Sequence, residues 1–161
     1  MRNIIATALA TVVVPGVAVI LVPYLILQAT GGLTPPQIGV IEVICILLAL
    51  AGAAMVVWVS VAFVTHGKGT PVPVDPPKNL VAAGLYRFVR NPMYFGALLT
   101  LFAEAIFFRS AWILLYAGLV WLALHTFTVL VEEPQLARRF GDLYLEYKAK
   151  TPRWIPRPPV R

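Results

Sequence analysis

The sequence has few charged residues and few of the residue types that build metal sites or disulfides. Charged residues make up 12% of its 161 residues, whereas soluble domains average about 25%. It contains one cysteine, Cys45, and two histidines, so an intrachain disulfide is excluded and zinc-ligand spacing is missing. We therefore predict no metal site, and an ordinary soluble domain is excluded.

Motifs that bind phosphate or nucleic acid are also missing. Neither G-x-G-x-x-G nor a P-loop occurs in the chain, which argues against a soluble Rossmann-type cofactor site. No nucleic-acid-binding motif accompanies the net charge of +6. We interpret this charge as a determinant of membrane topology and of affinity for anionic lipid headgroups, and we expect no nucleic-acid partner.

Apolar residues dominate what is present. They make up 60% of the sequence, and roughly 20 consecutive apolar residues suffice for a helix to cross a bilayer. Four runs qualify, at residues 4–29, 38–64, 92–108 and 111–131. The first run is longer than the apolar core of a signal peptide and has no cleavage site, so we interpret it as an anchor, kinked at Pro15 and Pro23.

The boundaries of the last two runs are the most informative. Only Arg109 and Ser110 separate them, which predicts a tight antiparallel helical hairpin. The third run begins at Asn91-Pro92. Proline is tolerated in the first helical turn, and asparagine is a favourable capping residue, so we predict that Asn91 caps this helix.

Basic residues indicate the orientation. They gather in the 65–91 loop and in the tail after Glu132, whereas the first loop, TGGLTPPQIG, carries no charge. The positive-inside rule therefore places both termini and the 65–91 loop in the cytoplasm, which four crossings satisfy. We expect an integral protein of a bacterial or archaeal inner (cytoplasmic) membrane.

The tail after the fourth run shows helical periodicity. Its apolar residues alternate with charged ones and are Leu136, Phe140, Leu143, Tyr144 and Tyr147. This pattern predicts a basic amphipathic helix on the cytoplasmic face. The predicted fold is thus an all-α integral membrane domain over residues 1–161: four transmembrane helices with a C-terminal helical hairpin, a cytoplasmic loop and an amphipathic C-terminal helix.

The adjacent carboxylates Glu132 and Glu133 should repel each other, so a positive partner is expected. Arg87 and Arg90, at the foot of the third helix, are the candidates because the hairpin brings the lower ends of the last two helices together. One interpretation is that the pair marks the interface and ends the helix before Pro134. A second interpretation is a site that recognises a cation: an arginine, a ligand amine or a sulfonium.

Three further ionisable residues lie within apolar runs. Glu104 is a functional candidate because charge inside a membrane is costly, or else it reaches the far interface and pairs with Arg109. Glu42 is a weaker case of the same kind. His125 lies about two helical turns before the glutamate pair, and we expect it to bond across helices rather than to bind a metal.

Two motifs together carry a family resemblance. RNPMYFG at residues 90–96, followed by EEPQLARRFGDLYLEYKAKTPRWIP at 132–156, resembles the isoprenylcysteine carboxyl methyltransferase and phospholipid methyltransferase superfamily of integral membrane enzymes. The resemblance covers residues 66–157. Asn91 stands where this superfamily usually has histidine, and Leu85 where proline is commoner. Asparagine can donate a hydrogen bond but cannot titrate near neutrality as an imidazole does.

The resemblance implies an S-adenosylmethionine-dependent methyltransferase that releases S-adenosylhomocysteine. It places the catalytic region at residues 66–161, after two N-terminal transmembrane helices in 1–65. The implied cofactor-binding residues are Gly84, Leu85, Tyr86, Asn91, Tyr94, Gly96, Glu132 and Glu133. The implied catalytic residues are Arg90, Glu133 and Arg153.

The acceptor is expected to be a membrane lipid or a lipidated small molecule. The carboxylate of an isoprenylcysteine-type amphiphile is favoured, because the basic loop and tail suit an anion and a carboxylate needs no general base. A phospholipid amine is the second candidate, with Glu132 or Glu133 accepting the proton. An NADPH-dependent membrane reductase of the sterol reductase type and a non-catalytic accessory protein are rival functions. The oligomeric state stays open.

Overall fold

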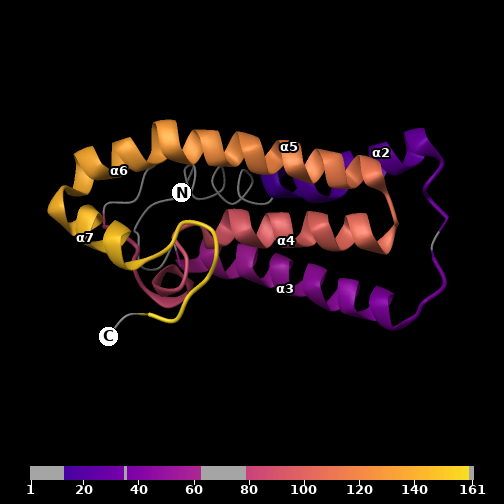
Figure 1. Cartoon of the computed structure of the whole chain (residues 1–161), viewed down its shortest axis with the longest axis horizontal. Helices are drawn as coiled ribbons and strands as arrows, with labels where there is room; N and C mark the ends of the chain where they lie inside the picture. Colours follow the sequence, from indigo (N-terminus) through magenta and orange to yellow (C-terminus); the bar gives the residue numbers. More distant parts are fainter. Residues whose placement is uncertain (1–12, 35, 63–78, 160–161) are drawn as a thin grey trace, which may run out of the picture.

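A computed structural model describes residues 13–34, 36–62 and 79–159 (Figure 1). Arg2 and the start of the first apolar run lie outside the described residues, as does the part of the cytoplasmic loop that contains Lys68 and Lys78. All regular structure within them is helical, which confirms the all-α prediction. The elements are η1 (Val17–Leu21), α2 (Val22–Thr30), α3 (Val40–Ala62), η3 (Gly84–Arg87), α4 (Pro92–Phe107), α5 (Ala111–Phe127), η4 (Thr128–Glu132), α6 (Glu133–Phe140) and α7 (Asp142–Lys150).

Three helical segments are long and apolar enough to cross a membrane: Val13–Thr30, Val40–Ala62 and Ala111–Phe140. The outward surfaces of the long helices carry large exposed apolar side chains such as Leu50 and Leu122. Soluble proteins rarely expose apolar surface on this scale, so the chain is an integral membrane protein. In the first segment, the π-helical turn η1 lies between Pro15 and Pro23, where kinks are predicted.

The shorter helix α4 lies between α3 and α5 (Figure 1). Its enclosed position is reflected in its buried residues, which are Pro92, Gly96, Leu98, Thr100, Leu101, Ala103 and Ala105. Four crossings, with α4 as the third, stay a prediction because α4 is shorter than a full span.

Two glycines set the separation of α3 and α4. A Cβ atom added to Gly96 would lie 2.6 Å from the carbonyl oxygen of Gly52, and one added to Gly52 would clash with the carbonyl oxygen of Gly96. Such small residues let two membrane helices approach backbone to backbone. The start of α4 is therefore fixed against α3. The residues just before α4 are held close to α3 for the same reason.

The predicted tight hairpin between α4 and α5 is confirmed. Arg109 adopts a left-handed conformation with φ of 51°, and the Ser110 hydroxyl caps α5 by accepting a hydrogen bond of 3.3 Å from the backbone nitrogen of Ile113. Arg109 pairs with Glu42 at 3.1 Å. Of the two interpretations of Glu104, the one in which it pairs with Arg109 is therefore wrong: Arg109 binds Glu42, and Glu104 Oε2 is buried without a hydrogen-bond partner among the described residues.

The C-terminal region differs from the predicted single amphipathic helix. Residues from Ala111 to Phe140 form one continuous helix, so the interpretation that the helix ends before Pro134 is also wrong. The π-helical turn η4 ends two residues before this proline, and a π-helical turn changes the backbone hydrogen-bond register close to the point where proline lacks an N–H. Gly141, with φ of 54°, then ends α6.

The turn at Gly141 also divides the predicted apolar face. Leu143 is 69% exposed, whereas its neighbour Tyr144 is only 2% exposed. Helical spacing across residues 136–147 therefore does not correspond to one surface, because α7 begins a new direction after Gly141. This reversal returns the C-terminal segment to the start of α4 (Figure 1).

Candidate active site

The C-terminal segment is bonded along the backbone that leads into α4. The amide nitrogen of Arg90 donates to the carbonyl oxygen of Pro152 at 2.8 Å, and that of Arg157 donates to the carbonyl oxygen of Phe88 at 3.0 Å. Residues 151–157 thus run beside residues 88–91, although some sixty positions separate them in the sequence. This junction brings together the two motifs that carry the family resemblance.

Asn91 belongs to this junction rather than to a helix cap. It occupies the N-cap position of α4, but its side chain makes no capping hydrogen bond. Its amide nitrogen donates instead to the carbonyl oxygen of Arg153 at 3.2 Å. The prediction that the Asn91 side chain caps the helix is therefore wrong, because the amide faces the C-terminal segment.

Glu133 is surrounded by three cations. Its Oε1 accepts from Arg90 Nη1 at 2.9 Å and from Arg153 Nε at 2.6 Å. Its Oε2 accepts from Arg153 Nη2 at 3.1 Å and lies 2.8 Å from Lys148 Nζ. Glu133 is only 5% exposed. Its bidentate contact with Arg153 raises the pKa of the Arg153 guanidinium above its usual value.

The sequence predicts part of this cluster. Arg90 is the expected positive partner of the glutamate pair, whereas Arg87 is exposed to solvent. No sequence pattern indicates a role for Lys148, and the resemblance places Arg153 near the reaction without a partner. The reversal at Gly141 brings both of them to Glu133, and no local spacing in the sequence indicates that reversal.

Glu132 has a different environment from its neighbour. It is half-buried at the end of the π-helical turn. Thr128 Oγ1 donates to its Oε2 at a long distance of 3.5 Å, and the hydroxyl of Tyr94 on α4 also hydrogen-bonds to it. Its hydrogen-bond partners among the described residues are thus neutral hydroxyls, and the carboxylate keeps acceptor capacity.

The residues leading into α4 are fixed by packing. Gly84 has φ of +59°, and a Cβ atom there would clash with the indole ring of Trp58, so no side chain fits. Leu85 is half-buried and Tyr86 is buried. The predicted cofactor residue Gly96 faces α3 at the helix contact described above.

Tyr147 on α7 anchors this lead-in segment. Its hydroxyl donates to the carbonyl oxygen of Tyr86 at 2.8 Å. Burial raises the pKa of the Tyr147 phenol, so the hydroxyl stays a donor throughout the neutral pH range. The bond connects α7 to the 3-10 turn η3 independently of Glu133.

We expect Tyr147→Phe to lower the free energy of unfolding by about 1 kcal/mol, since it removes one partly buried hydrogen bond. Thermal unfolding in detergent micelles measures the change. Tyr24→Phe is the control, because Tyr24 is largely exposed on α2. Equal melting temperatures for the two variants would contradict the assignment.

His125 also binds the C-terminal segment. Its Nδ1 accepts from Trp154 Nε1 at 3.0 Å, and its ring stacks on Trp121 with centroids 5.3 Å apart. The expected bond to another membrane helix is therefore replaced by a bond to residue 154. This contact holds the C-terminal segment at Trp154, next to the residue whose carbonyl oxygen binds Asn91.

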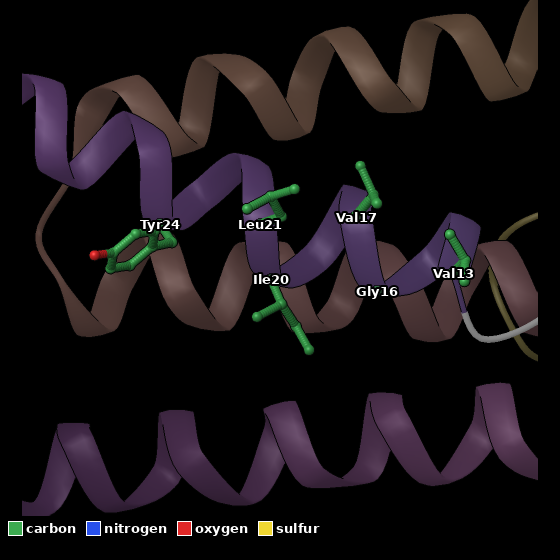
Figure 2. A pocket seen from close by; sticks show the side chains of 6 residues that line it. All are labelled: Val13, Gly16, Val17, Ile20, Leu21 and Tyr24. Atoms are coloured by element: carbon green, nitrogen blue, oxygen red, sulfur yellow. The ribbon is translucent and has the colours of Figure 1, made fainter.

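A separate hollow lies on the first membrane segment, away from these charged groups in the sequence. It has a volume of about 370 Å³ and is lined by Val13, Gly16, Val17, Ile20, Leu21 and Tyr24, as Figure 2 shows. All these residues come from one helical segment, and none is charged. The hollow supplies no reactive group and is suited to contact with lipid chains.

Comparison with known families identifies the chain. A model of the family described as phospholipid methyltransferase matches residues 40–143, more than half of the sequence. The chain belongs to the phospholipid methyltransferase family. This confirms the resemblance and extends it, because the match also includes α3. The protein is a membrane methyltransferase that acts on lipid-like substrates, and its family generally uses S-adenosylmethionine. No curated protein matches the chain significantly.

Proposed function

We propose that this phospholipid methyltransferase family member transfers a methyl group from S-adenosylmethionine to a lipid-like acceptor and releases S-adenosylhomocysteine. The proposed site lies where the start of α4 meets η4 and the C-terminal segment. The observation that carries the proposal is Glu132, a half-buried carboxylate that pairs with no cation among the described residues and keeps acceptor capacity. Such a carboxylate can bind the ammonium group or a ribose hydroxyl of S-adenosylmethionine, so the residues present fit this cofactor.

The residues have distinct proposed tasks. Tyr94 and Glu132 face the cofactor, and the segment from Gly84 to Tyr86, held by Trp58 and Tyr147, forms the adjoining wall. When bound, the cofactor supplies an electrophilic methyl group. The protein's contribution is to align the acceptor with that methyl group and to exclude water.

The favoured acceptor is the carboxylate of an isoprenylcysteine-type or related amphiphile. Arg90, Lys148 and Arg153 surround the single carboxylate of Glu133, so the cluster carries surplus positive charge that suits an anion. A carboxylate nucleophile needs no general base. The second candidate is a phospholipid amine, which the family description favours; Glu132 would then accept its proton.

We also propose that both termini face the cytoplasm of a bacterial or archaeal cell. The described basic residues beyond the membrane gather at the end that carries the site: Arg87, Arg90, Arg138, Arg139, Lys148, Lys150, Arg153 and Arg157. At the opposite end, Arg109 is paired with Glu42. This asymmetry follows the positive-inside rule and gives the site access to a water-soluble cofactor.

Calorimetric titration of the lipid-supplemented protein with S-adenosylhomocysteine tests the cofactor. We expect wild type to bind, and Glu132→Gln to weaken binding at least tenfold, since roughly one charged hydrogen bond is lost. Glu146→Gln, in an exposed position on α7, is the matched control and should bind like wild type. Binding of NADPH in place of the nucleoside would support a reductase, and binding of neither would support an accessory protein.

A further inference from the structure

We propose that Glu133 does not contact the cofactor. It is a positioning residue that holds the C-terminal segment, and Arg153 in particular, against the start of α4. Glu132 is then the only ligand-facing carboxylate of the adjacent pair. This inference rests on the proposed function for the identity of the ligand, but the role of Glu133 in holding the segment can be tested without it.

The first argument is the number of hydrogen bonds that Glu133 already accepts. An ionised carboxylate has about four acceptor positions. Glu133 receives one contact from Arg90, two from Arg153 and one from Lys148. Its acceptor positions are thus filled by the protein's own cations, and a ligand could bind this carboxylate only by displacing one of them.

The second argument is the origin of the three cations. Arg90 precedes α4, Lys148 lies near the end of α7, and Arg153 belongs to the C-terminal segment. Glu133, at the start of α6, therefore joins three separate parts of the chain at one buried point. The backbone hydrogen bond from Arg90 to Pro152 is a second link between the start of α4 and the C-terminal segment.

The third argument is the contrast with Glu132. The two residues are adjacent, yet no cation pairs with Glu132 among the described residues, whose contacts to it come from the hydroxyls of Thr128 and Tyr94. A positively charged ligand group can therefore approach Glu132 without breaking an ion pair. The geometry divides the pair into one structural and one ligand-facing carboxylate.

The arrangement also leaves Arg153 able to act. Its Nε and Nη2 contact Glu133, whereas a guanidinium carries five N–H donors in all. Nη1 has no partner among the described residues, so it can face an anionic acceptor while the other side of the guanidinium is held. Glu133 thus acts on the reaction through Arg153.

Limited trypsin digestion tests the holding role directly. Cleavage after Lys150 requires the C-terminal segment to open, so the rate follows the population of the open form. We expect Glu133→Gln to speed this cleavage at least tenfold, about the effect of one lost charged contact, whereas Glu132→Gln leaves it unchanged. Equal cleavage rates for wild type and Glu133→Gln would overturn the proposal.

A double-mutant cycle tests whether Glu133 acts through Arg153. We expect Glu133→Gln and Arg153→Gln each to lower kcat, and the double variant to be no slower than the slower single variant, because residues acting through one contact are not additive. Affinity for S-adenosylhomocysteine should change less than about threefold in Glu133→Gln. Additive losses in kcat, or a loss of affinity as large as that of Glu132→Gln, would overturn the proposal.

Two controls keep the outcomes separate. If Glu133→Gln does not fold, Arg153→Gln replaces it in the digestion, because Arg90 and Lys148 still neutralise Glu133 and the Lys150 cleavage site remains. If wild type binds no S-adenosylhomocysteine, the proposed function fails, whereas the digestion still decides whether Glu133 holds the C-terminal segment.

Discussion

Gly96→Ala is expected to lower the free energy of unfolding by about 2 to 3 kcal/mol, the range of overpacking in a close contact. The added methyl group would lie 2.6 Å from the backbone oxygen of Gly52 and 3.0 Å from Met55 Cβ. A backbone oxygen cannot move aside as a flexible side chain can, so α3 and α4 must separate. Thermal unfolding in detergent, followed by far-ultraviolet circular dichroism, measures the loss.

Gly118→Ala is the matched control. Gly118 also lies in a membrane helix, α5, but a Cβ atom there meets nothing within 4 Å. Alanine favours a helix over glycine by about 1 kcal/mol, so this variant should melt at or above the wild-type temperature. If the two alanine variants have the same melting temperature, the close approach of α3 and α4 is incorrect.

Arg90→Met is expected to cost about 3 kcal/mol of stability, as removal of one partner from a buried ion pair does. The Arg90 side chain is 10% exposed, and it bonds to Glu133, whose side chain is 6% exposed. Methionine retains most of the apolar contact but none of the charge. Glu133 keeps Arg153 and Lys148, so the protein should still fold in detergent, and its melting temperature can be compared with that of wild type.

Arg87→Met separates this effect from a general loss of positive charge. Arg87 lies in the same lead-in segment but is exposed, so its replacement should change stability by no more than about 0.5 kcal/mol. Methyl transfer should fall strongly in Arg90→Met and stay near wild type in Arg87→Met. A similar loss in both variants would indicate that net charge, rather than the cluster, controls activity.

Several features could be predicted because they depend on residues close together in the sequence. Hydropathy summed over a run of about twenty residues identifies a membrane helix without knowledge of its neighbours. The hairpin follows from the two residues, Arg109 and Ser110, between the third and fourth runs. The family could be recognised because the spacing of its two motifs is itself a property of the sequence, and the family match agrees.

Some contacts could not be predicted, even though the sequence singles out the residues that make them. Asn91 is unusual for its motif, yet its role depends on a carbonyl group at Arg153. Glu42 is the weaker of two candidates by its place in the apolar run, but it is the partner of Arg109. In each case the deciding contact joins distant parts of the chain, so neither periodicity nor spacing reports it.

The sequence by itself determined that this protein is helical, lies in a membrane and belongs to its methyltransferase family, because hydropathy and motif spacing are local properties. The tertiary structure decided the separate environments of Glu132 and Glu133. Gly141 ends one helix and reverses the chain, so Lys148 and Arg153 reach Glu133 while Glu132 is left with hydroxyl neighbours. Two identical adjacent residues differ only through contacts that folding creates.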